Sequence, residues 1–348
     1  MVVPQVIKET MRLPPLPTIR DILRLYRLHA IRQLSQNFLM DQRITDKIVK
    51  ACGRIKYHEV CEVGPGPGGI TRSILNRNPS RLIVIEKDAR FLPALDLLEE
   101  SSNGRMEVVL GDILNYDMSK VFSDNKRKSW EESPPQINII GNLPFSVSTP
   151  LIIKWIQAIS EKKSAWSYGR TQLTLTFQKE VAERMVAEIM SAQRCRLSIM
   201  CQNWCNVEHK FTIPGKAFVP KPDVDVGVVH FTPLVIPKIP LPFHIVEKVV
   251  RNVFSFRQKY SIRGAETLFP YPVREELGMK MYKLADVDPT TRPFQLTIEE
   301  FGQLCQAYCN ICDEDPRLYK YNHRASKSKE ADYEDDEEDS RPMLSQTV

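Results

Sequence analysis

The sequence predicts an α/β protein in which helices cover both faces of a parallel sheet, followed by a smaller α-helical domain. From residue 40 to 232, short apolar runs alternate with turn signals and helical patterns. A strand–helix–strand rhythm of this kind is typical of parallel sheets. A Pro-rich stretch, TPLVIPKIPLP, then covers residues 232–242, and the pattern beyond it is helical to about residue 320. The length of 348 residues agrees with two domains.

Each predicted strand is a short β-rich run that ends at a turn. The parallel strands are expected at HEVCEVG (58–64), RLIVIEKD (81–88), MEVVLGD (106–112) and QINIIGN (136–142), with a helix at GGITRSIL (68–75). Two later strands are expected at residues 171–178 and 224–233. The last run alternates around its β-branched residues, which predicts a half-exposed or hairpin strand.

Charge is distributed unevenly along the chain. The formal net charge is +5, but residues 324–348 alone carry −4, so the remainder carries about +9. A basic body favours a polyanion such as nucleic acid, although a solvated surface with surplus Lys is the plainer alternative. The acidic tail is low in hydrophobic residues and is expected to be disordered. No apolar run approaches the ~20 residues of a membrane span, so no membrane partner is expected.

The eight cysteines and the N-terminal segment indicate the cellular compartment in which the protein works. No secretory signal opens the chain, so a reducing compartment is favoured over a disulfide framework. Cys305, Cys309 and Cys312 have helical spacing with no interleaved His, which favours packed or surface thiols over a metal site. The first 38 residues hold six Lys/Arg and only two acids. That pattern fits either a mitochondrial transit segment or an ordinary basic helix.

A glycine-rich loop follows the first predicted strand. Gly64, Gly66 and Gly69 match the spacing of a dinucleotide-binding turn, and Glu86 ends the next strand 22 residues after Gly64. An acid at that point accepts hydrogen bonds from ribose hydroxyls. The spacing alone leaves NAD and S-adenosylmethionine both open.

Two details of the loop favour S-adenosylmethionine. Glu62 precedes the first glycine and is expected to face the crevice, where it would pair with a positively charged ligand and repel a pyrophosphate. Pro65 and Pro67 remove two backbone N–H donors that a pyrophosphate would need. Asp112, at the end of the third strand, is placed to accept from the exocyclic amine of the cofactor's own adenine, although Gly-Asp is also a plain turn pair.

The stretch Asn142-Leu143-Pro144-Phe145 follows the fourth strand. An adenine N6 amine is a poor nucleophile because its lone pair is delocalised into the ring. Acceptors that bind its two N–H groups out of the ring plane favour the tetrahedral geometry needed for attack on a methyl group. The Asn142 side-chain oxygen and a carbonyl near Leu143, fixed by Pro144, are suited to that role. Phe145 offers a face for base stacking.

These motifs together resemble the rRNA adenine N6,N6-dimethyltransferases. QNFLMD (36–41), EVGPGPGGIT, IEKD, GD and NLPF occur in the family's order, followed by FQKEVAERM (177–185), RLSIMCQNWCNV (196–207) and AFVPKPDVDVGVV (217–229). The resemblance covers nearly the whole chain, and the N-terminal stretch and acidic tail are similar to those of mitochondrial members. One departure is Asp225, where many members have serine.

The resemblance implies a Rossmann-like class I methyltransferase domain and a role for specific residues. Gln36 and Leu39 would close over the methionine end, and Phe145 and Phe218 would stack on the target adenine. The implied cofactor contacts are Gln36, Leu39, Gly64, Glu86, Lys87, Asp112 and Asn142, and the implied catalytic residues are Asn142, Leu143, Pro144, Phe145 and Phe218; no metal is expected. Lys87 would act mainly through its backbone or by flanking the adenosine.

The implied activity is S-adenosylmethionine-dependent dimethylation of two adjacent adenines in a 3′-terminal hairpin loop of mitochondrial small-subunit (12S) rRNA. The enzyme would act as a monomer on the assembling small ribosomal subunit in the mitochondrial matrix. The predicted organisation is a transit segment (1–27), a methyltransferase domain (28–239), a helical RNA-binding domain (240–323) and an acidic tail (324–348). Two alternatives are a non-enzymatic partner of the mitochondrial transcription machinery and a DNA adenine methyltransferase.

A surface for RNA is expected in the helical domain, within RNVFSFRQKYSIRG (251–264). As one helix, this stretch would pack its aromatic face and spread four cations beside it: Arg251, Arg257, Lys259 and Arg263. Such cations would grip a phosphate backbone with an affinity that falls as salt rises. A solvated helix face is the alternative.

Overall fold

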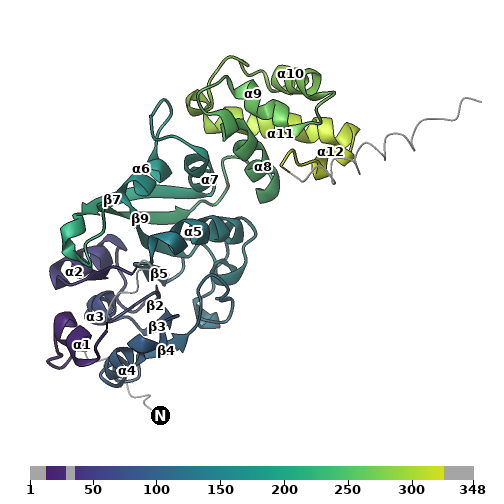
Figure 1. The fold of residues 1–348 in the computed structure, drawn as a ribbon. Coiled ribbons are helices and arrows are strands. Elements are labelled where there is room, and N and C mark those ends of the chain that lie inside the picture. The colour runs from purple at the N-terminus through teal and green to yellow at the C-terminus, as the bar shows by residue number, and fades with distance from the viewer. Residues whose placement is uncertain (1–12, 29–35, 325–348) are drawn as a thin grey trace, which may run out of the picture. The chain divides into compact units, whose positions relative to one another are not determined.

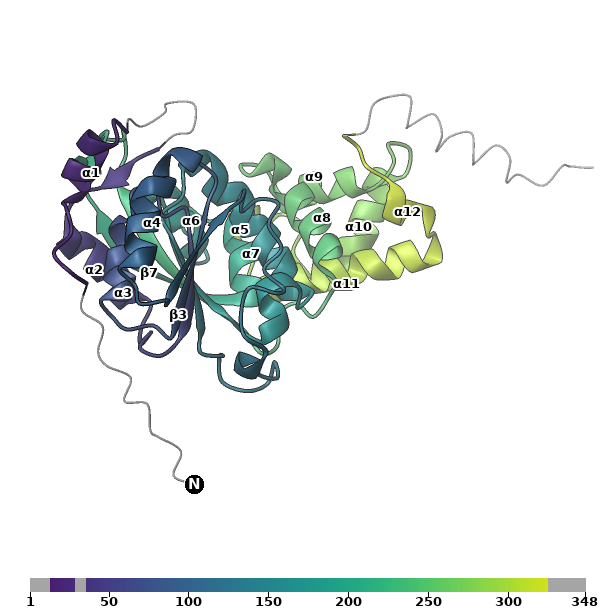
Figure 2. The same cartoon turned by 90° about the horizontal axis from the view of Figure 1, so that it is seen from below.

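The computed structural model describes residues 13–28 and 36–324. The chain divides into two compact units (Figures 1 and 2). The first unit comprises residues up to 187 together with residues 201–237, and the second comprises residues 188–200 and those from 238 onward.

The first unit is built on a seven-stranded sheet in the order β4-β3-β2-β5-β6-β9-β7. Five strands run parallel to one another, and β9 is antiparallel to both β6 and β7. The parallel strands are β2 (Glu59–Val63), β3 (Arg81–Glu86), β4 (Met106–Leu110), β5 (Ile137–Gly141) and β6 (Gln172–Gln178). The predicted α/β class and its parallel sheet are therefore confirmed.

The antiparallel end of the sheet differs from the prediction. β9 (Val226–Pro233) lies between β6 and β7 (Cys205–Ile213), and seven of its eight residues are buried. The half-exposed alternative is wrong because both faces of the strand are packed, whereas the hairpin alternative agrees with its antiparallel pairing to β7. That partner, β7, was not predicted; its CNVEHKFTI pattern mixes polar and apolar residues, as befits an edge strand exposed on one face.

Helices flank the sheet on both sides. Figure 2 shows α2 (Gln42–Ala51), α3 (Gly69–Leu75) and α4 (Leu92–Glu100) on one side and α5 (Phe145–Ser160) on the other. The helices α6 (Lys179–Val186) and α7 (Arg196–Trp204) follow β6 in the chain. A small second sheet pairs β1 (Phe38–Leu39) with β8 (Phe218–Val219), which ties the segment before α2 to the loop before β9.

The N-terminal helix α1 (Ile19–Leu25) packs into the first unit. Thr18 and Asp21 form a reciprocal capping box at its start. Ile22 is fully buried, and Leu28 is nearly so, in the cluster that also contains Phe38, Ile70 and Phe91. Arg72 of α3 donates to the Pro17 carbonyl over 2.6 Å. Part of the predicted transit segment thus contributes to the core of the α/β unit.

The second unit contains five helices in the described residues from 238 onward. They are α8 (Phe243–Val253), α9 (Ser261–Ala265), α10 (Arg274–Ala285), α11 (Ile298–Glu314) and α12 (Arg317–Lys320). Tyr308 is buried on α11 and donates to the Leu318 carbonyl over 3.1 Å. Lys248 of α8 donates to the carbonyls of Leu318 and Tyr319, which fixes the short C-terminal helix on the others.

The stretch 251–264 is not the single helix that was expected. α8 ends at Val253, a 3-10 turn covers Phe254–Phe256, and α9 begins at Ser261. Three of the four cations are engaged within the unit. Arg251 lies 3.7 Å from Glu247, Arg263 lies 3.3 Å from Glu266, and Arg257 donates to the Ala192 carbonyl. The single helix predicted from the sequence therefore does not form, and three of its four cations have partners within the unit.

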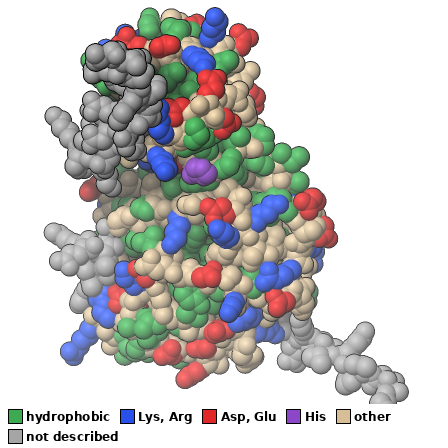
Figure 3. All heavy atoms as spheres, turned by 90° about the vertical axis from the view of Figure 1, so that its right-hand side faces the viewer, with side chains coloured by type: hydrophobic (Ala, Val, Ile, Leu, Met, Phe, Trp, Pro, Cys, Tyr) green, Lys and Arg blue, Asp and Glu red, His purple; other side chains and the backbone are tan. Residues whose placement is uncertain are grey.

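Other expectations from the sequence concern membranes, metals and surface charge. In the described part of the chain, no helix is long and apolar enough to cross a membrane, and no group of three or more His, Cys, Asp or Glu is placed to hold a metal. Cys305 and Cys312 are buried within the helical unit, and burial raises the pKa of both thiols. On the face drawn in Figure 3, basic and acidic side chains are interspersed. The acidic tail lies almost entirely outside the described residues.

Candidate active site

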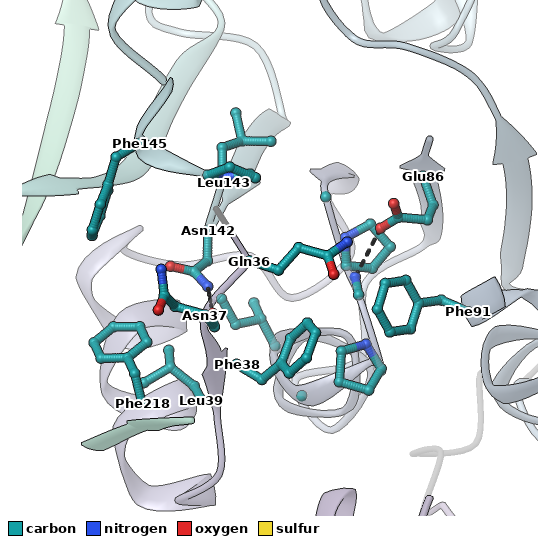
Figure 4. Close-up of a pocket in the computed structure, with 17 residues that line it drawn as sticks. Gln36, Asn37, Phe38, Leu39, Glu86, Phe91, Asn142, Leu143, Phe145 and Phe218 are labelled. Carbon is teal, nitrogen blue, oxygen red and sulfur yellow. Dashed lines mark hydrogen bonds between the residues drawn. The ribbon is translucent and has the colours of Figure 1, made fainter. Parts of the chain in front are cut away.

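A pocket opens at the carboxyl ends of β2, β3 and β5, where open α/β sheets bind their ligands. The β1–β8 pair and the first turns of α3 and α5 complete its walls (Figure 4). Its lining residues are Gln36, Asn37, Phe38, Leu39, Gly64, Pro65, Gly66, Pro67, Gly69, Ile70, Glu86, Phe91, Asn142, Leu143, Pro144, Phe145 and Phe218. Nine of the eleven residues predicted for the site are in this set; Lys87 and Asp112 are not.

The glycine loop has no room for side chains at two points. A Cβ on Gly64 would lie 2.8 Å from the Leu143 side chain, and one on Gly68 would lie 2.5 Å from that of Leu98. Both residues also have positive φ, +68° and +85°, a conformation that only glycine adopts without strain. Gly64 therefore presents bare backbone to the pocket, as a closely bound ligand requires, whereas the missing side chain of Gly68 makes room for Leu98 of the core.

Glu86 lies at one end of the pocket and is fastened by backbone donors. Its Oε1 accepts from the N–H groups of Lys87 (2.9 Å) and Asp88 (2.8 Å), and its Oε2 accepts from Gly66 N–H (2.9 Å). Burial raises the pKa of Glu86, and these three donors oppose the rise by stabilising the charged form. The carboxylate thus has a fixed orientation and retains acceptor capacity toward the pocket.

Gln36 lies toward the Glu86 end of the pocket (Figure 4). Its Nε2 donates to Asp88 Oδ2 over 2.9 Å, and its Oε1 accepts from Arg90 at 3.3 Å. Arg90 also forms an ion pair with Asp88 at 2.5 Å. The segment before α2 is thereby tied to the loop after β3 across the top of the pocket.

Asn142 lies at the opposite end and is held by two distant segments. Its Oδ1 accepts from the Thr176 hydroxyl of β6 over 2.7 Å, and its Nδ2 donates to the Asn37 carbonyl over 3.3 Å. Pro144, with φ −51° and ψ 140°, ends the extended segment and starts α5 at Phe145. Figure 4 places Phe145 and Phe218 at this same end of the pocket. The amide and the two rings are therefore neighbours.

An aromatic pair forms part of the wall near Glu86. Phe38 and Phe91 make an edge-to-face contact with ring centroids 5.5 Å apart, and both are buried. Sequence reasoning did not single out Phe38, Phe91 or Asn37 as site residues. Phe38 and Asn37 lie within the motif QNFLMD, so their position beside Gln36 and Leu39 was the available signal, whereas Phe91 has none because only packing brings it to the pocket.

Lys87 and Asp112 lie outside the pocket lining and pair with each other. The Lys87 ammonium is 2.8 Å from Asp112 Oδ2, and Asp112 Oδ1 accepts from Leu114 N–H over 3.0 Å. The hydrogen bond from Lys87 holds the pKa of Asp112 below its usual range. The two residues form an exposed ion pair just beyond Glu86.

Glu62 does not face the crevice as expected. Its side chain is buried beneath the glycine loop with 1% exposure, and it is absent from the pocket lining. Oε2 has no hydrogen-bond partner of ordinary geometry among the described residues. Burial raises the pKa of Glu62 to about 8, only partly offset by the neighbouring Thr71.

Comparison with known proteins decides which family has this site. The family model of ribosomal RNA adenine dimethylases matches residues 28–280. The chain belongs to this family. It is 58% identical over 331 residues to "Dimethyladenosine transferase 1, mitochondrial" of Macaca fascicularis, covering 94% of this chain and 96% of the relative. The protein of that name from Drosophila melanogaster is 50% identical over 330 residues, covering 94% and 98% of the two chains.

Solved structures agree in fold. A dimethyladenosine transferase from Plasmodium falciparum superposes with a TM-score of 0.60 at 22% identity, over 78% of this chain and 98% of that one. The 23S rRNA methyltransferase ErmE gives a TM-score of 0.52 at 20% identity, over 78% and 99%. As a member of the dimethylase family, the chain is an rRNA adenine dimethyltransferase whose cofactor is S-adenosylmethionine. The glycine loop, which lets a ligand approach its backbone closely, and the fixed Glu86 carboxylate beside it both fit this cofactor.

Proposed function

We propose that this enzyme transfers methyl groups from S-adenosylmethionine to the N6 atoms of two adjacent adenines in a 3′-terminal hairpin loop of mitochondrial small-subunit (12S) rRNA. The observation that carries the proposal is the Asn142 amide, fixed by Thr176 and Asn37 beside Phe145 and Phe218. Relatives that share more than half of its sequence are named mitochondrial dimethyladenosine transferases.

The cofactor would lie along the pocket between Glu86 and the Asn142 end. The Glu86 carboxylate would accept hydrogen bonds from the ribose hydroxyls, and the Gly64 backbone would allow close approach along the loop. Gln36 and Leu39 line the pocket from the segment before α2, where they would cover the bound cofactor. Lys87 and Asp112 would flank its adenosine from outside, because their ion pair lies beyond the lining.

S-adenosylmethionine supplies an electrophilic methyl group on a positively charged sulfur. The protein residues prepare the nucleophile. The target adenine, unstacked from the loop, would lie between Phe145 and Phe218, while Asn142 Oδ1 and the Leu143 carbonyl accept from its two N–H groups. These acceptors favour a tetrahedral nitrogen and are worth most in the transition state. No strong base is required, because the methylated amine is acidic enough to lose its proton to water.

The second transfer places a further demand on the pocket. A monomethylated adenine has one N–H left, so it can bind only one of the two acceptors. Asn142 and Leu143 must therefore be able to act singly, and the methyl group already present must fit where the other N–H was.

The test uses labelled S-adenosylmethionine, the purified full chain and a small-subunit rRNA 3′ hairpin, followed by nucleoside analysis. The expected product is N6,N6-dimethyladenosine at both adjacent positions. A matched hairpin with guanines at those positions and a DNA duplex containing adenines serve as controls and should remain unlabelled. Labelling of the duplex in preference to the hairpin would favour a DNA methyltransferase. No labelling of any substrate by protein that binds the cofactor would contradict the proposed activity.

The packing of α1 supports a transit segment shorter than the predicted residues 1–27. We propose that the protein acts in the mitochondrial matrix and that import leaves residues 13–28 in place, because removal of residues 1–27 would expose the surface that Ile22 covers. Deletion of residues 1–12 should leave the melting temperature within about 2 °C of the parent, whereas deletion of residues 1–27 should lower it by at least about 5 °C. Equal melting temperatures would contradict this role of α1.

A role in transcription is the second candidate from the sequence. In the described residues no feature specific to that role was found, and the intact pocket favours catalysis. The two would be separated by asking whether a variant that cannot bind the cofactor retains the function in mitochondria.

A further inference from the structure

Thr176 is a buried residue behind the pocket that reaches the Asn142 amide. It lies near the end of β6, opposite Val228 of β9, and its side chain is 1% exposed. Its hydroxyl donates to Asn142 Oδ1 over 2.7 Å, yet it does not line the pocket. The backbone at Thr176 is paired with β9 on one edge, and the pairing with β5 on the other edge ends one residue earlier, at Leu175.

The two partners of Asn142 together fix which way its amide points. The Asn37 carbonyl can only accept, so the atom facing it must be the nitrogen Nδ2. The oxygen Oδ1 then faces Thr176, whose hydroxyl serves as its donor. One lone pair of Oδ1 and one N–H of Nδ2 are left over. The oxygen that would bind the substrate amine is thus oriented by a residue on a neighbouring strand.

We propose that Thr176 is a positioning residue for methyl transfer, acting through Asn142; this rests on the proposed function. The last torsion of an asparagine side chain is broad, so the amide needs partners at both ends to stay in one orientation. Without the Thr176 hydroxyl, the Asn142 amide would keep only the 3.3 Å hydrogen bond to Asn37 among the described residues. The amide would then rotate, and its oxygen would meet the amine less often.

The second methyl transfer should depend on Thr176 more than the first. The unmodified amine has two N–H groups and can still be held by the Leu143 carbonyl when the amide is misoriented. The monomethylated amine has one N–H, so a misplaced Asn142 oxygen leaves fewer productive arrangements. Loss of the hydroxyl should therefore raise the share of monomethylated product.

The experiment compares Thr176→Val with Thr176→Ser and with a matched control, Thr174→Val. Thr174 lies two residues earlier on β6, points to the same face, is equally buried, and bonds His230 Nδ1 at 2.8 Å in place of Asn142. Both valine variants thus remove one buried hydroxyl from the same strand. Only the loss at Thr176 affects the amide.

We expect Thr176→Val to lower kcat about tenfold, the equivalent of one net hydrogen bond, while KM for the cofactor changes less than about twofold. The monomethylated share should rise, Thr176→Ser should restore kcat and product ratio, and Thr174→Val should keep both. Parental kcat and product ratio in Thr176→Val, or the same losses in Thr174→Val, would overturn the proposal.

A second readout does not need activity. In protein labelled with ¹⁵N at asparagine, the side-chain amide signals of Asn142 should shift in Thr176→Val and stay in place in Thr174→Val. Unshifted signals in Thr176→Val would overturn the positioning role. If the parent methylates none of the substrates, the proposed function fails, while the amide signals still report whether Thr176 orients Asn142.

Discussion

The key side chains at the two ends of the pocket are oriented by different kinds of hydrogen-bond donors and acceptors. At the β3 end, Glu86 is held by backbone N–H groups, two of them from the next two residues in the chain. At the β5 end, Asn142 is held by Thr176 and Asn37, which lie 34 and 105 residues away in the sequence. The first end is fixed mainly by local chain geometry, with one further donor from Gly66 in the glycine loop, and the second exists only when three separate segments have come together. Binding of the cofactor and chemistry on the substrate should therefore respond differently to mutation.

The largest expected effect is on catalysis, from Asn142→Ala. Removal of the amide takes away an acceptor that acts on the reacting nitrogen, and losses of such a group cost roughly a hundred- to a thousandfold in kcat. Cofactor affinity, measured by calorimetry, should fall much less than kcat, because Asn142 is one of several predicted cofactor contacts and Glu86 and the glycine loop are untouched. A parallel collapse of cofactor binding would show that the two ends are not separable.

The next effect is on binding, from Glu86→Gln. The neutral amide keeps the size of the side chain but loses the charge-assisted hydrogen bonds, and its NH₂ group opposes whichever backbone donors faced the oxygen that it replaces. We expect the Kd for S-adenosylmethionine to rise about ten- to a hundredfold. Glu107→Gln, on the adjacent strand β4 and half-exposed in an ion pair with Arg81, is the matched control and should leave the Kd unchanged. An unchanged Kd in Glu86→Gln would contradict the ribose assignment.

The same difference explains what could be predicted from the sequence. Glu86 and Gly64 belong to a local pattern of strand, glycine turn and acid, so spacing alone located them. Asn142 was found through its motif, but its hydrogen bond to Thr176 depends on the position of β6 in the sheet. No sequence pattern near either residue predicts that bond. Phe91 and β7 were missed for the same reason, since only packing places them.

The sequence prediction placed the Glu62 side chain in the crevice because Gly64, two residues later, begins the glycine loop. A strand residue next to a crevice can face either into it or into the layer beneath, and one residue of pleat decides between them. The partners of the cations in 251–264 were not foreseen for a similar reason. The spacing of the cations was visible in the sequence, but the acids and the Ala192 carbonyl that engage three of them were not.

A third prediction compares two carboxylates on adjacent strands. Glu62 lacks the three backbone donors of Glu86, and burial raises its pKa to about 8 from a usual value near 4.5. The folded protein therefore keeps a proton that the unfolded chain releases, so this group's contribution to stability is present at low pH and is lost as pH rises from about 4.5 to 8. Glu62→Gln should remove this loss, so its melting temperature should exceed the parent's by more at pH 8 than at pH 5. Parallel pH profiles of the two proteins would contradict the assignment.

The smallest effect is expected just outside the Glu86 end, from Lys87→Ala. The Lys87 side chain is 67% exposed, and its ion pair with Asp112 is screened by solvent, so the pair contributes about 0–1 kcal/mol at most. Its backbone N–H, which does bind Glu86, is retained in the variant. The Kd for S-adenosylmethionine should therefore rise less than about threefold. Lys87→Met, which keeps the length of the side chain without its charge, should behave the same way. A tenfold loss in both variants would mean that the ammonium itself contacts the bound cofactor, and the Glu86 end would then depend on a side chain as well as on the local backbone.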